Sequence, residues 1–194
     1  MRIGHDVIVF TKRDHEMSVG FLSRTFLDDR GAQEVYVPIV TWILPEHPLF
    51  LSCDDNDNPI IHECRFHPSF VRESRAALVP ILEYNSFCET VDDLLANLAT
   101  IRDHGTTIVI CALRRTEGDG ILELDLFESP DDIRISKTRD EQGRLVRYAR
   151  ARTFNEHLTE PLPIDYSLRA YCEILYIHHR VRITLRGKVV RLKR

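Results

Sequence analysis

A capped helix that leads directly into an uninterrupted apolar segment restricts the possible folds of this chain more than any other feature. The apolar side chains of residues 90–104 recur at the spacing of an amphipathic helix, at Val91, Leu94, Leu95, Leu98 and Ile101. Thr90 can cap the start of this helix, and Gly105 can end it. Residues 106–113 then form an apolar run, which is typical of a strand covered on both faces.

The rest of the chain carries further strand patterns, a helical pattern and two irregular segments. Strands are predicted at 6–11, 33–41 and 121–127. Pro38 lacks an amide hydrogen, so we expect the second of these strands to lie at an edge or to contain a bulge. Residues 70–87 have a helical pattern that Pro80 interrupts. A long loop with four prolines occupies 45–68, and a charged connector with short structured pieces occupies 128–165.

Residues 166–190 show two alternating strand patterns on either side of a two-residue link at His178–His179. The second pattern separates apolar from polar side chains. Val181, Ile183 and Leu185 fall on one face, and Arg180, Arg182, Thr184 and Arg186 fall on the other. The apolar face can be buried, whereas the row of guanidinium groups needs water or an anionic partner. The segment therefore predicts a β-hairpin with one basic face.

The composition indicates a folded chain with an uneven distribution of charge. The 194 residues are 43% hydrophobic and 29% charged, which suffices for a packed core and argues against disorder. No apolar run approaches the roughly 20 residues of a membrane span, and five scattered cysteines favour a reducing compartment. The net charge of −4 divides into −13 over residues 1–133 and +9 over residues 134–194. The basic part suggests contact with a polyanion; the alternatives are two lobes that attract each other, or solvated faces.

Four stretches of sequence match one protein family when they are considered together. They are MRIG-D-VIVF at the start, SVGFLSRTFL with EVYVPIVTW at 18–42, GTTIVICALRR with LELDL and DDIRI at 105–135, and the hairpin of 166–190. On these motifs the chain resembles the microrchidia (MORC) family of nuclear ATPases, in which a GHKL-type ATPase domain precedes a transducer-like domain.

The resemblance implies an α+β fold in two parts. Residues 1–118 would be the rear half of a GHKL (Bergerat) α/β sandwich, the C-terminal part of the ATPase domain. Residues 119–194 would be the start of a transducer-like, β-rich segment of the ribosomal protein S-five type. On this basis we expect the chain to begin within the ATPase domain.

The resemblance also identifies motifs that this sequence does not contain. The family takes its general base and magnesium ligand from a Glu-Asn-x-x-Asp helix, and its adenine contact from an Asp-x-Gly-x-Gly turn; neither occurs here. The string EYNSF at 83–87 is similar only superficially, so we interpret Asn85 as structural. ATP and Mg²⁺ are the cofactors of the full-length family proteins, and we expect neither to bind tightly to these residues.

Five residues match nucleotide-binding positions of the family, namely Gly105, Thr106, Met1, Arg2 and Gly4. The Gly-Thr step can join the water network around adenine, although any helix followed by a strand could show the same pair. The other three match the end of the ATP-lid motif, which leads into a helix facing phosphate. The family's phosphate-contacting lysine aligns with Val189. Lys188, one residue earlier, is therefore either a catalytic candidate or a solvated turn residue.

The end of the chain carries the candidate nucleic-acid contacts. Seven of the last fifteen residues are basic and none is acidic. DNA phosphates are the predicted partners of Arg180, Arg182, Arg186, Arg191, Lys193 and Arg194. The alternative is pairing with acidic residues of a partner domain. His62, Cys64 and His67 lack the spacing of a zinc site, so no metal site is predicted.

The resemblance implies a nuclear protein that acts in chromatin compaction and gene silencing. In the full-length protein, nucleotide would drive homodimerisation of the ATPase heads around DNA. This chain would be a fragment that does not hydrolyse ATP alone, and we expect no membrane association. Two alternatives stay open: a non-catalytic module that binds DNA or another polyanion, and a nonfunctional fragment that folds poorly because half of its sheet lacks neighbours.

Overall fold

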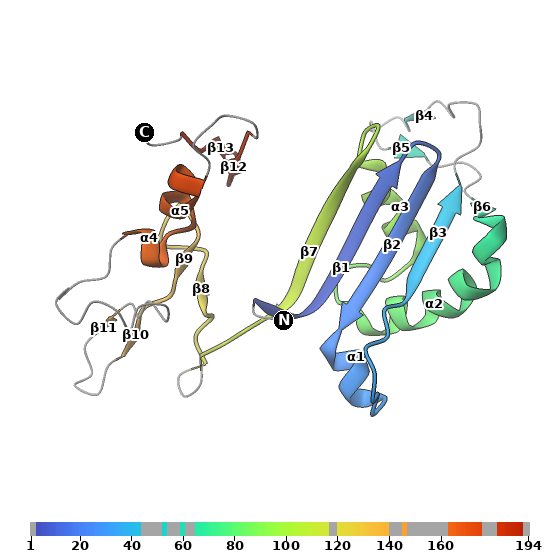
Figure 1. Cartoon of the computed structure of the whole chain (residues 1–194), viewed down its shortest axis with the longest axis horizontal. Coiled ribbons are helices and arrows are strands. Elements are labelled where there is room, and N and C mark those ends of the chain that lie inside the picture. The colour runs from blue at the N-terminus through green and yellow to red at the C-terminus, as the bar shows by residue number, and fades with distance from the viewer. Residues whose placement is uncertain are drawn as a thin grey trace. The chain divides into compact units, whose positions relative to one another are not determined.

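The computed structural model describes residues 3–43, 52–53, 59–60, 65–116, 120–139, 145–146, 163–175 and 182–191. The chain divides into two compact units, Met1–Leu113 and Arg114–Arg194 (Figure 1). The identities predicted for the two parts, an ATPase portion that ends near residue 118 and a transducer-like segment, remain predictions.

The first unit combines a long β-hairpin with three further strands of the same sheet and two longer helices. Its strands are β1 (Gly4–Arg13), β2 (Glu16–Ser23), β3 (Ile39–Ile43), β4 (Ser52–Cys53), β5 (Pro59–Ile60), β6 (Arg65–Phe66) and β7 (Gly105–Leu113). Its helices are α1 (Arg24–Asp29), the 3-10 helix η1 (Pro68–Phe70), α2 (Val71–Tyr84) and α3 (Val91–Ala99). The helix predicted at 70–87 is present, but Pro80 lies inside α2 and does not interrupt it.

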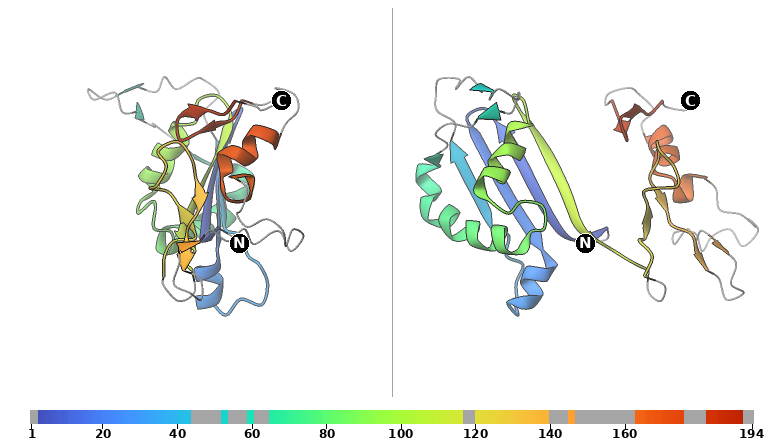
Figure 2. Two further views of the ribbon diagram at one scale, coloured as in Figure 1. Left: turned by 90° about the vertical axis from the view of Figure 1, so that its left-hand side faces the viewer. Right: turned by 180° about the vertical axis from the view of Figure 1, so that it is seen from behind.

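Five strands form one antiparallel sheet in the order β6-β3-β2-β1-β7 (Figure 2). β1 and β2 form a hairpin with a two-residue turn between Arg13 and Glu16. β1 also pairs along nearly its whole length with β7, although α2 and α3 lie between these strands in sequence. β1 therefore lies between β2 and β7 in the sheet, and it pairs the N-terminal hairpin with the last strand of the unit.

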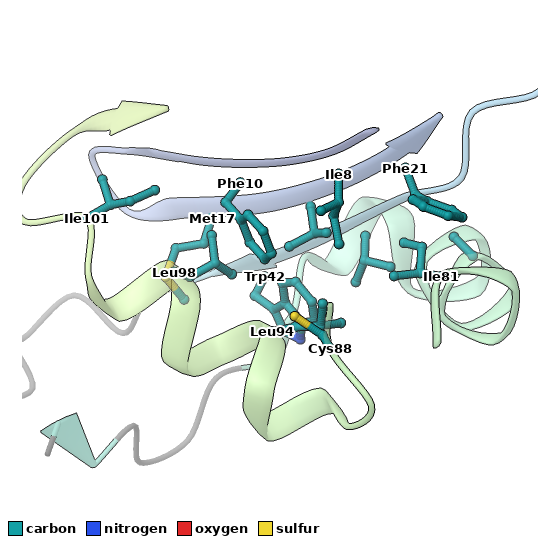
Figure 3. Packing of buried hydrophobic residues seen from close by; sticks show 13 residues of the cluster. Ile8, Phe10, Met17, Phe21, Trp42, Ile81, Cys88, Leu94, Leu98 and Ile101 are labelled. Carbon is teal, nitrogen blue, oxygen red and sulfur yellow. The ribbon is translucent and has the colours of Figure 1, made fainter. Parts of the chain in front are cut away.

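The core of the first unit lies between the sheet and the helices α2 and α3, which cover the same face of the sheet (Figures 1 and 3). Alternate side chains of β1 and β2 point to that face, namely Ile8, Phe10, Met17, Val19 and Phe21. Trp42 of β3 joins them and stacks on Phe66, with ring centroids 6.1 Å apart. Ile81 of α2 and Leu94 and Leu98 of α3 pack from the helical side. The predicted α+β class is confirmed.

The start of α3 lies where the sequence predicts it, but its end does not. Thr90 and Asp93 form a capping box: the Thr90 hydroxyl accepts from the Asp93 amide at 3.1 Å, and Asp93 Oδ2 accepts from the Thr90 amide at 2.9 Å. The helix ends at Ala99, after which Ile101 turns into the core. The prediction that Gly105 ends the helix is wrong. Gly105 opens β7, and a Cβ there would lie 3.2 Å from Ile101 Cγ2.

Two strand predictions also need correction. Among the described residues β7 lies at an edge of the sheet and is not covered on both faces, since Ile108 is 60% exposed. An apolar run shows that a strand can be buried. Whether each face of the strand is covered depends on the elements that pack against it. The strand predicted at 33–41 begins only at Ile39. Pro38 stays outside the β3 ladder, and its carbonyl accepts from the Phe21 amide at 3.0 Å.

In its described residues, the second unit contains short two-stranded ladders and two helices. Its strands are β8 (Leu124–Asp125), β9 (Arg134–Ile135), β10 (Thr138–Arg139), β11 (Leu145–Val146), β12 (Thr184–Leu185) and β13 (Lys188–Val189), and its helices are α4 (Pro163–Tyr166) and α5 (Leu168–Leu175). Each strand pairs antiparallel with its neighbour in sequence. Of the strand predicted at 121–127, only Leu124–Asp125 forms a strand, β8. No helix in the described parts of the chain has the length and apolar character needed to cross a membrane.

The largest difference from the sequence prediction falls in residues 166–190. Residues 168–175 form the helix α5, and the hairpin turn lies at Arg186–Gly187. The predicted link at His178–His179 lies outside the described residues. The hydroxyl of Ser167 accepts from the Ala170 amide at 3.0 Å and caps the first turn of α5. Apolar residues of this segment also recur at helical spacing, at Leu168, Tyr171, Cys172 and Leu175, and the capped turn favours the helix.

Gly4→Ala should destabilise the first unit. A Cβ at this position would lie 2.5 Å from the carbonyl oxygen of Cys111 and 2.7 Å from Ile110 Cγ2, so β1 and β7 would have to move apart. We expect the free energy of unfolding, measured by urea denaturation, to fall by about 2 kcal/mol. Gly20→Ala is the control, because its Cβ would have its nearest neighbour at 3.8 Å. Equal losses in the two variants would contradict this explanation.

Candidate functional site

The predicted Gly-Thr step lies at one end of the β1–β7 ladder. Thr106 is directly opposite Thr11 in the register, and their hydroxyl oxygens are 3.3 Å apart. We call these two residues the threonine pair. The Thr11 hydroxyl also donates to the carbonyl of Gly105 at 3.3 Å, and Lys12 Nζ donates to the carbonyl of Ile101 at 3.2 Å. These bonds hold the backbone before and at the start of β7 against the end of β1.

The threonine pair lies on the sheet face that α2 and α3 do not cover. Thr11 shares its face with Val9, because the neighbouring Phe10 points into the core. Thr106 is exposed. Neighbouring hydroxyls offer both donors and acceptors, so they can hold a water molecule or a polar edge of a ligand. The threonine pair can therefore bind a polar ligand.

Gly4 lies at the opposite end of the same ladder. It pairs with Leu113, which is the end of β7 farthest from the threonine pair. The separation of seven residues along β1 corresponds to about 23 Å. The structure therefore does not bring Gly4 together with the Gly-Thr step, and the observed role of Gly4 is to permit the close approach of β1 and β7. Met1 and Arg2 lie outside the described residues.

Asn85 makes structural contacts, as expected from its sequence position. Its side-chain oxygen accepts from the amides of Phe87 at 2.9 Å and Cys88 at 2.5 Å, and its Nδ2 donates to the carbonyl of Cys88 at 2.9 Å. These bonds shape the connection between α2 and α3.

Burial raises the pKa of the Cys88 thiol to about 11, which keeps it protonated and unreactive.

In the second unit a buried carboxylate connects three segments. Asp132 is 3% exposed. Its Oδ2 accepts from the Ser167 hydroxyl at 2.7 Å and from Arg134 Nε at 2.9 Å, and its Oδ1 accepts from the Arg169 amide at 2.9 Å. We call these four residues the Asp132 network. Because Ser167 also caps α5, the carboxylate fixes the start of that helix to the residues before β9.

The Asp132 network requires Asp132 to be charged. Burial by itself would raise the pKa of this carboxyl, since it penalises the charged form. The hydrogen bonds from Ser167, from Arg134 and from the amides of Arg169 and Ile133 favour the carboxylate, and they lower its pKa below the ordinary value. The same bond to Asp132 raises the pKa of the Arg134 guanidinium.

The hairpin turn of β12 and β13 carries an arginine in a backbone conformation that disfavours side chains. The φ angles of Arg186 and Gly187 are 50° and 77°, as in a type I′ turn. For a residue with a Cβ this conformation costs about 1 kcal/mol. Arg186 is exposed, as predicted, and its Nη1 donates to the Leu126 carbonyl at 2.7 Å and its Nε to the Pro130 carbonyl at 3.2 Å.

Two other arginines stand opposite each other at the open end of this hairpin. The ladder continues beyond the strands through a bond from the Val190 amide to the Ile183 carbonyl at 3.0 Å. The same register places Arg182 opposite Arg191, and both are exposed, whereas Val190 is buried. We call Arg182 and Arg191 the arginine pair. Opposed residues have Cα atoms about 5 Å apart, and like charges directly opposite each other are unfavourable unless an anion or water lies nearby.

Lys188 makes its contact within the second unit. Its Nζ lies 3.6 Å from Asp131 Oδ2. A hydrogen bond from Ser129 and the charges of Lys188 and Arg169 lower the pKa of Asp131. The catalytic candidate is thus paired with a carboxylate of its own unit. Three further predicted contacts with nucleic acid lie outside the described residues, namely Arg180, Lys193 and Arg194.

The histidine and cysteine set of the first unit is described only at His67. Its Nδ1 accepts from the Ser69 amide at 3.2 Å, and its Nε2 lies 3.3 Å from Glu16 Oε1. His62 and Cys64 lie outside the described residues. Among the residues that the structure does describe, no three histidine, cysteine or acidic side chains are grouped so that they could hold a metal ion.

Comparison with known proteins decides the family. MORC family CW-type zinc finger protein 3 from Mus musculus is 37% identical over 192 residues, which cover 98% of this chain and 18% of that protein. ATPase MORC2 from Homo sapiens is 31% identical over 196 residues, 100% of this chain and 15% of that protein. Protein MICRORCHIDIA 4 from Arabidopsis thaliana is 29% identical over 198 residues, 98% of this chain and 22% of that protein. The chain belongs to the MORC family. No protein-family model matches it.

Membership of the MORC family confirms the predicted resemblance and implies a GHKL fold for the α+β chain. The chain spans about a fifth of the length of these MORC relatives. Two of the MORC-like stretches meet in the second unit, because DDIRI contributes Asp132 and Arg134, and the segment at 167–169 contributes Ser167 and Arg169. The motifs that carry the resemblance there build the Asp132 network.

Thr11, Ser167 and Asp132 are site residues that the sequence did not predict. Thr11 offers no local signal, because pairing between β1 and β7 brings its partner from 95 residues away. Ser167 does offer one, since serine is a preferred N-cap residue whose side-chain oxygen accepts from an amide of the first helical turn. Asp132 and Arg134 are separated by two positions, which places their side chains on one side of an extended backbone.

Asp132→Asn should destabilise the second unit. The neutral amide accepts weaker hydrogen bonds and leaves Arg134 without its ionic partner, so we expect the free energy of unfolding to fall by about 2 kcal/mol at neutral pH. The pKa of Asp132 is lowered in the folded state. Its contribution is therefore fully present above the unfolded-state pKa of about 4 and is lost as the pH falls through the folded-state value.

Urea denaturation over the range from about pH 3 to pH 7 tests this prediction. The wild type should lose stability steeply at the acidic end, and the Asp132→Asn variant should lose less. Asp92→Asn is the control, because Asp92 lies in the first turn of α3 in the other unit. Parallel pH profiles for the wild type and Asp132→Asn would refute the assigned role.

Proposed function

We propose that this chain is part of a MORC-type ATPase in which the first unit supplies one wall of the nucleotide site. The threonine pair supports this proposal: two hydroxyl groups 3.3 Å apart stand at the start of β7, where the family has its Gly-Thr step. Hydroxyls in this arrangement can bind adenine directly or through water. The family relatives named ATPase MORC2 and ATPase MORC2A are consistent with this role.

We further propose that hydrolysis needs groups that lie outside these 194 residues. MORC-type hydrolysis needs a general base and Mg²⁺, which neutralises charge on the phosphates. The Glu-Asn-x-x-Asp and Asp-x-Gly-x-Gly motifs that would supply and position them do not occur in this sequence. The chain would therefore take part in ATP binding only within a complete site.

The 194-residue chain should show no ATP turnover above background in a phosphate-release assay. It should also show no tight, Mg²⁺-dependent uptake of a nonhydrolysable ATP analogue by calorimetry, because the magnesium ligand is missing. Turnover that Thr106→Ala abolishes while the fold is retained would overturn this prediction. Thr107→Ala is the matched control, since Thr107 is also exposed but points to the other face of β7.

A nucleotide titration by NMR tests the wall itself. Added ADP should shift the amide signals of Thr11, Gly105 and Thr106 more than those of the rest of the first unit. Thr106→Ala should reduce these shifts, and Thr107→Ala should leave them unchanged. Shifts spread evenly over the unit, or none at the threonine pair, would argue against a nucleotide role.

A second function, contact with DNA phosphates, is favoured by the arginine pair. The register places the exposed residues Arg182 and Arg191 opposite each other, so one phosphate could contact both guanidinium groups. In this proposal the whole MORC protein acts in the nucleus in chromatin compaction and gene silencing, and its ATPase heads homodimerise on binding nucleotide. A non-catalytic polyanion-binding module would use the same arginine pair.

The double variant Arg182→Glu/Arg191→Glu should bind duplex DNA more weakly and with a shallower salt dependence. For every phosphate that the variant no longer neutralises, the slope of log K against log salt should fall by about 0.9. Fluorescence anisotropy at several salt concentrations measures both quantities. Arg72→Glu/Arg75→Glu on α2 makes the same change in net charge at exposed positions of the first unit and is the control. Equal weakening by both double variants would show that only net charge matters.

A further inference from the structure

Two arginines fasten the β12–β13 hairpin to the loop before β9. Arg186 reaches out of the hairpin turn to the carbonyls of Leu126 and Pro130, at 2.7 and 3.2 Å. Arg169 reaches from α5 to the Asp131 carbonyl, with Nη2 at 2.6 Å and Nε at 2.8 Å. We call Arg169 and Arg186 the arginine clamp. One arginine approaches the loop from the helix, and the other approaches it from the hairpin.

The Arg169 guanidinium also contacts the hairpin. Its Nη2 lies 3.4 Å from the Leu185 carbonyl and its Nη1 lies 3.5 Å from the Val189 carbonyl, so one side chain links both strands to the loop. The backbone of Arg169 is itself held by the carboxylate of Asp132 at 2.9 Å. The Lys188–Asp131 ion pair adds a third connection between the hairpin and the loop. The position of the hairpin thus depends on the Asp132 network through Arg169.

The conformation of Arg186 points the same way. Its φ of 50° lies in the region where asparagine or glycine fits with less strain, and Asn-Gly is the preferred pair for a type I′ turn. An arginine at this position is compensated by what its side chain contacts. Those contacts are backbone carbonyls 56 and 60 residues earlier in the chain. A guanidinium that donates to two carbonyls has fewer donors left for a phosphate.

We propose that Arg169 and Arg186 are positioning residues, which hold the hairpin so that the arginine pair is presented to an anionic phosphate backbone. This inference rests on the proposed binding of DNA phosphates. It divides the basic residues of the hairpin region into two classes. Arg182 and Arg191 bind the phosphates, whereas Arg169 and Arg186 donate to backbone carbonyls within the unit and do not touch the DNA.

The two classes respond differently to removal of their charge. Without the arginine clamp the hairpin still carries Arg182 and Arg191, but it must be ordered again on binding, which lowers affinity. The number of phosphates neutralised in the complex is unchanged, and so is the salt slope. Removal of the Arg182 charge eliminates a phosphate contact and reduces the slope, while the hairpin stays in place.

Arg186→Met and Arg182→Met are a matched pair for the test, since they remove the same charge four residues apart. The 194-residue chain is used, with a duplex of about 20 base pairs as the probe. NMR order parameters are measured for amides 183–190, with β8 and β9 as internal references. Arg186→Met should lower the hairpin values from about 0.85 toward 0.6 and weaken binding about tenfold at an unchanged salt slope. Arg182→Met should leave the order parameters unchanged and reduce the slope by about 0.9.

Two more variants keep the test decisive. Arg186→Asn favours the turn but removes the clamp contacts. We therefore expect the order parameters of the hairpin amides to fall although asparagine is the better turn residue. Arg169→Met should act like Arg186→Met, with the reference strands unchanged. Unchanged order in Arg186→Asn, or a reduced slope in Arg186→Met, would overturn the proposal. If the wild type does not bind DNA, the phosphate-binding function fails, and the order parameters of Arg186→Met and Arg186→Asn alone decide whether the clamp holds the hairpin.

Discussion

A buried carboxylate that holds a helix-capping serine is the interaction on which both units depend. Asp132 accepts from Ser167 at 2.7 Å, and Asp6 accepts from Ser23 at 2.6 Å. In each case the serine oxygen also accepts from an amide of the first helical turn, and so fixes the helix start to a strand or to the residues before one. A carboxylate removed from water would be costly without these bonds. The arrangement therefore ties α1 to β1, and α5 to the residues before β9.

Hydrogen bonds and ion pairs within the second unit also engage several of its basic side chains. In the second unit Arg134 binds Asp132, Lys188 binds Asp131, and Arg169 and Arg186 donate to carbonyls. A count of basic residues therefore includes side chains that are already engaged within the unit. The arginine pair differs because its two members are exposed and opposed on one face of the hairpin.

Much of the first unit could be predicted, because its signals are local. The strand at 6–11 and the capped start of α3 follow from alternation, helical spacing and the side chain of Thr90. The edge position of β7, the pairing of Thr11 with Thr106 and the distance of Gly4 from the Gly-Thr step could not be predicted. Each depends on which strands pair and in what register, and no single segment encodes that choice.

The MORC membership, the α+β class and the basic C-terminal part all follow from the amino-acid sequence, because motifs, composition and hydrophobic spacing are properties of the chain alone. Three further features emerge only on folding: residues 168–175 are helical, Arg186 belongs to a clamp, and Arg182 stands opposite Arg191. The physical reason is that the apolar residues of 168–175 fit both an alternating and a helical spacing. A serine cap bound to a distant carboxylate then selects the helix, and a guanidinium is free or engaged according to the carbonyls that folding brings to it.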